Sequence, residues 1–234
     1  MNVSAIIPAA GSGERFGEAK QFKLLAGRPL LFHTLKPFLK SAEIDEIIIV
    51  VPRDDVESTH RDMVSMSAGK TVKVVAGGNR RQDSVKNGVM ATSKESTLVC
   101  IHDAARPFVT QNLIQQSVSA CGNVDGAVVA LPSCDTVKYS ENDIVEKTLN
   151  RKKIWLAQTP QTFNKEKLLQ ALDNAEKKQL TGTDESALME VMGFGIKLVT
   201  GDSNNFKITN QDDWDRAEAV ASQLDDTQAQ GKTL

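Results

Sequence analysis

Short apolar runs alternate with longer amphipathic segments along most of the chain. The short runs are rich in β-branched residues and are bounded by turn residues, so they predict β-strands. These strands are expected at residues 3–7, 46–51, 72–75, 97–101 and 126–131. Because the runs are almost continuously apolar, they are typical of central strands that other elements cover on both faces.

Helices are predicted between these strands. Pro29 suits a first helical turn, and the segments at 84–91 and 113–121 follow loops with Ser or Thr residues that can cap a helix. A further strand is expected at 196–199, and the polar end at 225–234 is expected to fray. The predicted helices are 29–39, 54–66, 84–91, 113–121, 165–178, 184–192 and 211–224. Strands that alternate with helices indicate an α/β fold with one doubly wound, mostly parallel sheet.

The pattern changes between residues 133 and 149, where apolar and polar residues alternate. A polar Ser-Glu-Asn-Asp sequence lies in the middle of this stretch. An alternating pattern around a polar turn predicts a β-hairpin that projects from the sheet, and not a further buried strand.

Composition limits the possible partners. The 234 residues are 40% hydrophobic, enough for a core of ordinary size, and they carry a formal net charge of −2. This balance argues against a polybasic nucleic-acid surface and against an anchor to anionic membranes. Any bound anion must therefore be held by local clusters of Lys and Arg.

The cysteines and the apolar stretches indicate a soluble, cytoplasmic protein. Cys100, Cys121 and Cys134 lie far apart and match neither a disulfide framework nor a CxxC metal site. We therefore expect buried or inert thiols in a reducing compartment. The apolar run at 3–10 ends in a glycine-rich segment, and no apolar stretch is long enough to span a bilayer.

Five polar clusters follow predicted strand ends or lie in neighbouring loops, where ligands bind in doubly wound sheets. The first is PAAGSGERF at 8–16, followed by KQF at 20–22. Gly11 and Gly13 let backbone N–H groups approach an anion, while Arg15 and Lys20 supply positive charge. The spacing differs from the dinucleotide fingerprint, since Phe16 stands at the third glycine position, and no GK[ST] follows. The cations favour phosphate binding over a simple tight turn.

The second cluster is GGNRRQDSVKNG at 77–88. Its two glycines expose backbone groups that could bind a base edge, but taken alone the cluster favours a charged surface loop capped by Ser84. The third is HDAARP at 102–107, where Asp103 follows a buried strand and needs a partner for its charge. Asp103 could bind Mg²⁺ directly or through water, accept ribose hydroxyls, or pair internally with Arg106, which could also hold a substrate phosphate. His102 is interpreted as structural, because no other histidine shows metal-ligand spacing with it.

The fourth and fifth clusters lie later in the chain. The fourth is RKKIWLAQTPQ at 151–161, and the fifth combines TDE at 183–185 with GDSNNFKIT at 201–209. Each offers a cation or a hydroxyl group suited to a second phosphate. Taken singly, each is more typical of an ordinary solvated loop.

Together these segments resemble the 2-C-methyl-D-erythritol 4-phosphate cytidylyltransferase family. The matching motifs stand in family order and cover nearly the whole chain: PAAGSGERF with KQF, GGNRRQDSVKNG, HDAARP, DTVK at 135–138, AQTPQ at 157–161, TDE and NFKIT at 205–209. Seven motifs in order make a chance similarity implausible. The family usually has proline before the lysine of KQF, whereas this chain has Ala19, so Lys20 is expected to be held less rigidly.

The resemblance implies a single Rossmann-like nucleotidyltransferase domain over residues 1–234. It implies transfer of CMP from CTP to 2-C-methyl-D-erythritol 4-phosphate, with release of pyrophosphate, in the non-mevalonate isoprenoid pathway. Mg²⁺ or another divalent cation is the implied cofactor. The implied assembly is a cytoplasmic homodimer formed through a β-arm at about 133–153, with no nucleic-acid or membrane partner.

The resemblance also assigns site residues. Arg15, Lys20 and Lys207 would stabilise charge on the α-phosphate. The residues implied to bind CTP are Pro8, Ala9, Ala10, Gly11, Gly13, Gly78, Asn79, Arg81, Ser84, Asp103 and Ala104. Those implied to bind the acceptor are Asp103, Arg106, Arg151, Thr159, Thr183 and Lys207. Arg151 would serve the active site of the partner subunit, and Asp103 would lie near the metal, directly or through water.

Other functions remain open at this point. A ribitol-5-phosphate cytidylyltransferase would use the same CTP loop and a similar acceptor, although HDAARP and DTVK favour the methylerythritol enzyme. Sugar-1-phosphate nucleotidyltransferases share the glycine-rich first loop. A non-catalytic nucleotide-binding protein would keep the glycines and lose Arg15, Lys20 or Lys207, and all three are present. A structural scaffold gives no reason for clustered cations at so many strand ends.

Overall fold

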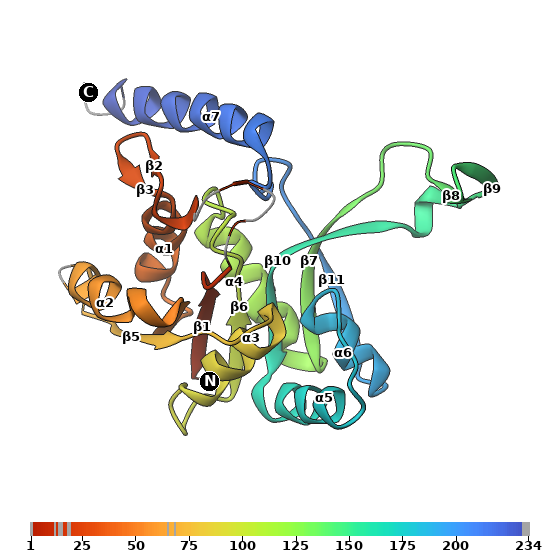
Figure 1. Cartoon of the computed structure of the whole chain (residues 1–234), viewed down its shortest axis with the longest axis horizontal. Helices are drawn as coiled ribbons and strands as arrows, with labels where there is room; N and C mark the ends of the chain where they lie inside the picture. The colour runs from red at the N-terminus through yellow and green to blue at the C-terminus, as the bar shows by residue number, and fades with distance from the viewer. Residues whose placement is uncertain are drawn as a thin grey trace.

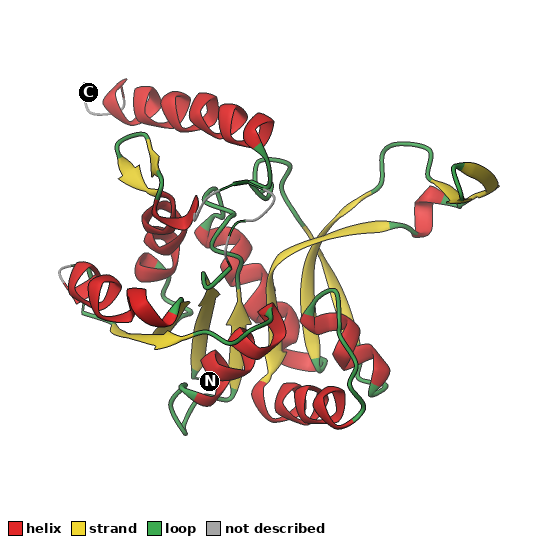
Figure 2. Ribbon diagram, viewed as in Figure 1, coloured by secondary structure: helices red, strands yellow, loops and turns green. Residues whose placement is uncertain are grey.

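A seven-stranded sheet forms the centre of the protein, with helices on both faces (Figures 1 and 2). The computed structural model describes residues 2–11, 13, 16–17, 20–64, 66–67 and 69–230, of which 64 and 224–230 are described by backbone alone. The strand order is β11-β7-β10-β6-β1-β4-β5. The strands are β1 Val3–Pro8, β4 Glu46–Val51, β5 Thr71–Ala76, β6 Leu98–Ile101, β7 Gly126–Pro132, β10 Trp155–Asn164 and β11 Ile196–Thr200.

The sheet is mostly parallel, as predicted. Strand β1 pairs in parallel with β4 and β6, β4 with β5, and β7 with β11, whereas β10 runs antiparallel to both of its neighbours. Strand β10 was not predicted from the sequence, where most of its residues belong to the polar cluster at 151–161. Pro160 interrupts its run of donors, and its pairing with β7 shifts register between Ala157 and Gln161. Gln158, Thr159 and Gln161 are nevertheless buried, so polarity along this strand does not mark exposure.

Side chains of the central strands alternate between two hydrophobic layers. Ile7, Ile47 and Ile49 pack into one layer, and Ile6 and Ile48 pack into the other. This arrangement confirms that the central strands are covered on both faces. The expected central position is wrong for 72–75, because β5 is an edge strand whose residues are only partly buried. Its apolar residues still contact both layers: Val72 and Val74 pack against the first, beside helix α2 (Val56–Val64), and Val75 packs against the second.

The helices occur where they are predicted, with shifted ends. They are α1 Leu30–Lys40, α2, α3 Arg81–Met90, α4 Gln111–Ala120, α5 Lys165–Lys177, α6 Glu185–Val191 and α7 Gln211–Gln230. Helix α3 begins three positions before the predicted residue 84, because the Asp83 carboxylate accepts the backbone N–H of Arg80 and also pairs with the Arg80 guanidinium ahead of Ser84. Pro29 precedes α1 and is not part of its first turn. Helix α7 continues through Gln230, so the fraying expected from residue 225 is wrong for 225–230.

A β-hairpin projects from the sheet between β7 and β10, and it confirms the predicted arm (Figure 1). Its strands are β8 Lys138–Glu141 and β9 Ile144–Thr148, and every residue of both strands is exposed. Asn142 and Asp143 have φ values of 50° and 63°, the left-handed pair that a two-residue hairpin turn requires. A second small hairpin, β2 Leu24–Leu25 with β3 Arg28–Pro29, was not predicted.

The cysteines are free thiols, and two of the three are buried. Burial raises the pKa of Cys100 to about 12 and that of Cys121 to about 11, so both stay protonated at neutral pH. Cys134 is exposed at the start of the arm, so burial accounts for two of the three thiols. Within the described residues, no helix combines the length and apolar character needed to cross a membrane.

Close packing of α3 on the sheet depends on Gly88. A Cβ atom at this position would lie 2.6 Å from Cγ2 of Ile6 and 3.0 Å from Cγ2 of Val50, and both side chains are fully buried. We expect Gly88→Ala to lower the unfolding free energy by about 1–3 kcal/mol, although alanine is the better helix former. Urea denaturation measures this change.

Gly122→Ala is the matched control, because a Cβ atom there meets no atom within 4 Å. Its unfolding midpoint should stay close to that of the unmodified protein. An unchanged or raised midpoint for Gly88→Ala would contradict the packing described for α3.

Candidate active site

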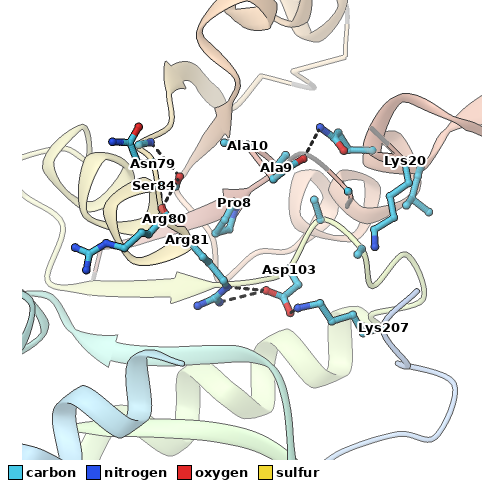
Figure 3. Close-up of a pocket in the computed structure, with 17 residues that line it drawn as sticks. Pro8, Ala9, Ala10, Lys20, Asn79, Arg80, Arg81, Ser84, Asp103 and Lys207 are labelled. Atoms are coloured by element: carbon cyan, nitrogen blue, oxygen red, sulfur yellow. Dashed lines mark hydrogen bonds and ion pairs between the residues drawn. The ribbon is translucent and has the colours of Figure 1, made fainter. Parts of the chain in front are cut away.

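A cavity of about 550 Å³ opens beyond the carboxyl ends of β1, β5 and β6 (Figure 3). Its volume is in the range of small-molecule sites. The residues that line it are Pro8, Ala9, Ala10, Gly11, Gly13, Lys20, Gln21, Leu30, Gly78, Asn79, Arg80, Arg81, Ser84, Asp103, Ala104, Ala105 and Lys207. They come from four segments that are far apart in the sequence. The sheet therefore assembles one site from the first, second, third and fifth predicted clusters.

Two glycine-bearing loops meet at one wall of the cavity. The N–H groups of Ala9 and Gly77 donate to the carbonyls of Val50 and Val51, which ties both loops to β4. A Cβ atom at Gly77 would lie 2.3 Å from Cβ of Ala10, so only glycine allows the loops to approach this closely. The N–H of Gly78 donates to Oγ of Ser84 at 3.1 Å, and this hydroxyl donates to the carbonyl of Arg80. Ser84 thus orients the second loop and is not the cap of α3.

The Asp103 carboxylate is 8% exposed and lies among three cations. Arg81 reaches Oδ1 at 3.2 Å, and Lys207 reaches Oδ2 at 2.9 Å from the other side (Figure 3). Nε of Arg106 lies 3.7 Å from Oδ2. Burial alone would raise the pKa of Asp103, but the charges of Arg81, Lys207 and Arg106 outweigh it and hold the pKa well below its usual value. Asp103 is therefore ionised at neutral pH.

Arg81 joins Asp103 to a second buried carboxylate. Its Nη1 donates to both carboxylate oxygens of Glu185, at 2.7 and 2.9 Å, and Glu185 is 1% exposed. Burial raises the pKa of Glu185, and the charge of Arg81 opposes that rise. Three cations and two carboxyl groups leave this group of five side chains with at least one net positive charge. That surplus favours an anionic ligand at the cavity.

A chain of hydrogen bonds holds the segment that carries Asp103. Nε2 of His102 must donate to the carbonyl of Arg106 at 3.0 Å, which leaves Nδ1 to accept from the Thr159 hydroxyl at 3.0 Å. The Thr159 hydroxyl in turn accepts the N–H of Asp103 at 3.1 Å. Burial lowers the pKa of His102 to about 4, so its imidazole is neutral. Both ring nitrogens of His102 are thus used in hydrogen bonds within the protein, which supports its interpretation as a structural residue.

The structure brings all eleven of the expected CTP-binding residues to the cavity, but only Asp103 and Lys207 of the six expected to bind the acceptor. Within the described part of the chain, Arg106, Thr159 and Thr183 lie outside the cavity lining. Arg106 and Thr159 are buried, and Nη1 of Arg106 donates to the carbonyl of Asn205 at 2.8 Å. Arg151 is exposed beside the arm and donates to the carbonyl of Cys134. Arg106 and Thr159 therefore contact the segments that carry Asp103 and Lys207 from behind, whereas Arg151 and Thr183 are exposed away from the cavity lining.

The predicted residue Arg15 and the unusual Ala19 lie outside the described residues. Four cavity residues were not predicted: Gln21, Leu30, Arg80 and Ala105. Gln21, Arg80 and Ala105 lie within the motifs KQF, GGNRRQDSVKNG and HDAARP, so their place at the cavity could have been predicted from these motifs. Leu30 begins a helix as an apolar residue, and nothing in the sequence marks it as a ligand contact.

Glu185 was also missed, although it belongs to the TDE motif from which Thr183 was selected. Asp184 caps α6 through the N–H of Ala187 and accepts from Nε2 of Gln161. Glu185 instead turns inward to Arg81. The acidic residues of this motif therefore organise the site, while Thr183 is exposed.

Direct metal binding by Asp103 does not fit the geometry. Both of its carboxylate oxygens are engaged by cations, Oδ1 by Arg81 and Oδ2 by Lys207. Within the described residues, no group of three or more His, Cys, Asp or Glu side chains could hold a metal ion. The protein side of this cavity is suited to an anion, not to a bare divalent cation.

A doubly wound sheet with two glycine-bearing loops and a cation-rich cavity at its carboxyl edge defines a nucleotide-binding α/β protein of the nucleotidyltransferase class. The model of one family, 2-C-methyl-D-erythritol 4-phosphate cytidylyltransferase, matches residues 3–223. The chain belongs to this family.

Individual relatives agree with this assignment. The protein of that name from Geobacter metallireducens is 40% identical over 225 residues, covering 94% of this chain and 97% of the relative. The one from Geotalea uraniireducens is 41% identical over 224 residues, covering 94% and 96%.

Solved structures agree as well. The crystal structure of 4-diphosphocytidyl-2C-methyl-D-erythritol synthase from Anaerococcus prevotii is 33% identical, with a TM-score of 0.84 over 94% of this chain and 98% of that one. The Thermus thermophilus 2-C-methyl-D-erythritol 4-phosphate cytidylyltransferase is 33% identical, with a TM-score of 0.78 over 95% and 100%. The resemblance and the fold class inferred from the sequence are confirmed, and the comparisons do not support the ribitol alternative.

The buried neutral His102 predicts a specific pH dependence of stability. Its pKa is about 4 in the folded protein and 6.5 when unperturbed, so the unfolded chain takes up the proton first as the pH falls. Stability should therefore fall between pH 6.5 and 4, by about 3 kcal/mol in all at 1.36 kcal/mol per pH unit. Urea unfolding at a series of pH values measures this contribution.

The variant His102→Gln separates the contribution of His102 to this pH dependence from the contributions of other groups. This variant should show a flatter dependence over the same interval, whereas His60→Gln, at an exposed helical position, should keep the original slope. Equal slopes for all three proteins would refute the assignment of a neutral, hydrogen-bonded His102.

Proposed function

We propose that this protein transfers CMP from CTP to 2-C-methyl-D-erythritol 4-phosphate, giving 4-diphosphocytidyl-2-C-methylerythritol and pyrophosphate. The family supports this reaction. The observation that carries it is the approach of Lys20 and Lys207 to one cavity whose wall is built from two glycine-bearing loops (Figure 3). A triphosphate and a phosphate monoester are both anions, and this cavity combines backbone donors with positive side chains.

In the proposed reaction a phosphate oxygen of the acceptor attacks the α-phosphorus of CTP. A new P–O bond forms, the bond from the α-phosphorus to the α,β-bridging oxygen breaks, and pyrophosphate leaves with that electron pair. The attacking monoester is largely ionised at neutral pH, since its second pKa is about 6. It needs no general base, which agrees with a described cavity lining that contains neither His nor Cys. The protein's task is to orient two anions and to offset their repulsion.

Each wall of the cavity takes one part of this task in the proposal. The loop from Ala9 to Gly17 wraps the triphosphate, while Gly78, Asn79 and Ser84 contact the cytosine. Lys20 and Lys207 stabilise the charge that develops on the α-phosphate, together with Arg15. By analogy with the loss of one transition-state donor, each lysine contributes roughly 10²–10³ in kcat.

The remaining predicted residues act around the acceptor. Asp103 and Ala104 stand where the nucleotide sugar and the acceptor meet, and Arg81 fixes the Asp103 carboxylate. Arg106 and Thr159 hold this segment from behind, and they and Thr183 would need to reorient to reach the acceptor phosphate. A divalent cation remains a prediction, with the oxygens of CTP as its expected ligands because the protein carboxylates are engaged.

We further propose a cytoplasmic homodimer, with residues 1–234 of each subunit forming one nucleotidyltransferase domain. The arm supports this assembly, because Tyr139, Ile144 and Val145 are large apolar side chains exposed on it. Arg151 at the base of the arm lies outside the cavity of its own chain and would serve the partner's active site.

Pyrophosphate release tests the proposed reaction. Protein is incubated with CTP, Mg²⁺ and either methylerythritol 4-phosphate, ribitol 5-phosphate or no acceptor. We expect strong release with methylerythritol 4-phosphate alone. Release only with ribitol 5-phosphate would overturn the proposed acceptor. No pyrophosphate release from folded protein with either acceptor would overturn the proposed reaction.

Hybrid dimers test the shared site. Lys20→Ala and Arg151→Ala should each be nearly inactive alone, because each removes one side chain from every active site. In a random mixture half of the dimers are hybrids with one complete site, so activity should recover to about a quarter of the unmodified level.

A mixture of Lys20→Ala with Lys207→Ala is the matched control. These residues lie in the cavity of one chain, so no hybrid site is complete and activity should stay low. Subunit exchange is verified with tagged protein. No recovery by the first mixture despite exchange would show that Arg151 does not act across a dimer.

A further inference from the structure

A third hydrophobic cluster lies beneath α7, apart from the two layers that cover the sheet. Its buried members are Leu25, Leu30, Ile208, Trp214, Ala217 and Ala221, with Phe16, Phe108 and Phe206 packed against them. Helix α7 and the β2–β3 hairpin lie side by side at the carboxyl edge of the sheet (Figure 1). The cluster therefore occupies the end of the molecule where the cavity opens.

Three segments of the cavity enter this cluster. Phe16 follows Gly13 in the first glycine-bearing loop, and Leu30 itself lines the cavity. Ile208 is fully buried directly after Lys207, and its N–H donates to the carbonyl of Ala105. Packing under α7 thus reaches the proposed triphosphate loop and both proposed catalytic lysine segments.

Trp214 makes the contacts that connect these segments. Its side chain is 2% exposed, and its ring lies 5.6 Å from the ring of Phe16 at an interplanar angle of 54°. Nζ of Lys23 lies 4.7 Å from the Trp214 ring centre and 4.9 Å from that of Phe16. Nζ of Lys20 lies 5.6 Å from the same Phe16 ring. Aromatic and cation–π contacts of this kind add directional attraction to the burial of apolar area.

The start of α7 is fixed relative to Lys207. Asn210 caps the helix by accepting the N–H of Asp213 at 2.9 Å, and Asp213 accepts the N–H groups of Thr209 and Asn210. Burial raises the pKa of Asp213, but hydrogen bonds from Thr209 and Asn210 and the nearby charge of Lys20 lower it overall. Only two residues separate Lys207 from this cap, so movement of α7 would move the lysine.

We propose that Trp214 is a positioning residue that holds the Phe16 loop and the Lys20 turn in register with Lys207. The proposal rests on the proposed function, because it assigns these segments to the triphosphate and the α-phosphate. Trp214 touches no reacting atom. It acts through Phe16 and Lys23 on one side and through the cap of α7 on the other.

Tryptophan fluorescence tests the coupling between Trp214 and the nucleotide. The chain has two tryptophans, so Trp155→Phe leaves Trp214 as the only one. With Mg²⁺ present, CTP should change its emission, with the same Kd that calorimetry measures, whereas cytidine without phosphates should not. Unchanged emission while calorimetry detects CTP binding would overturn the proposal.

Steady-state kinetics test the positioning role. Trp214→Leu fills the space without an aromatic face, and we expect kcat/KM for CTP to fall by about 10- to 100-fold through misplaced groups, with the acceptor KM nearly unchanged. Trp214→Phe keeps a ring against Phe16 and should retain most of the activity, which also separates the effect from misfolding.

Ala221→Gly is the matched control, since it weakens the same helix and cluster two turns beyond Trp214. It should keep the unmodified kinetic constants at a temperature where all variants are folded. An equal loss in Ala221→Gly, or no loss in Trp214→Leu, would overturn the proposal. If the unmodified protein itself released no pyrophosphate, the proposed function would fail. The fluorescence experiment would still show separately whether Trp214 is coupled to bound CTP.

Discussion

The buried carboxylate of Asp103 stands at the point where the segments of the site meet. Removing an ion of this size from water costs several kcal/mol, and the cost is offset only by close partners of opposite charge. Those partners come from α3, from the loop after β6 and from the segment before α7, as Arg81, Arg106 and Lys207. Because each partner is needed, one charge constrains three parts of the chain that are distant in sequence.

The same constraint explains why several expected ligand residues lie behind the cavity. His102 and Thr159 use their polar atoms on each other and on the backbone of Asp103 and Arg106. Arg106 uses Nη1 to hold Asn205, two residues before Lys207. As a result Arg81 and Lys207 line the cavity, while His102, Arg106 and Thr159 lie outside its lining. Under the proposed function, a triphosphate that enters the cavity meets cations that are already oriented, which lowers the reorganisation needed at the moment of reaction.

The sequence predicted the parallel core well, because strands such as β4 are almost wholly apolar and are covered on both faces. It failed at β10, where buried Gln158, Thr159 and Gln161 resemble a loop, since burial of polar groups there depends on partners from other segments. For the site, glycine-rich and basic motifs identified most of the cavity wall. Leu30 and Glu185 were not predicted because their roles depend on tertiary contacts. Leu30 packs in the cluster under α7, and Glu185 pairs with Arg81.

The claim that Asp103 holds Lys207 in place is tested most directly by a double-mutant cycle on kcat/KM with Asp103→Asn and Lys207→Met. The two groups are 2.9 Å apart, and contacting charged groups couple by about 0.5–3 kcal/mol. We predict that the double variant is little worse than the more damaged single variant, with a coupling of at least about tenfold, or about 1.4 kcal/mol. Losses that simply multiply would contradict this account and would mean that the two residues act independently.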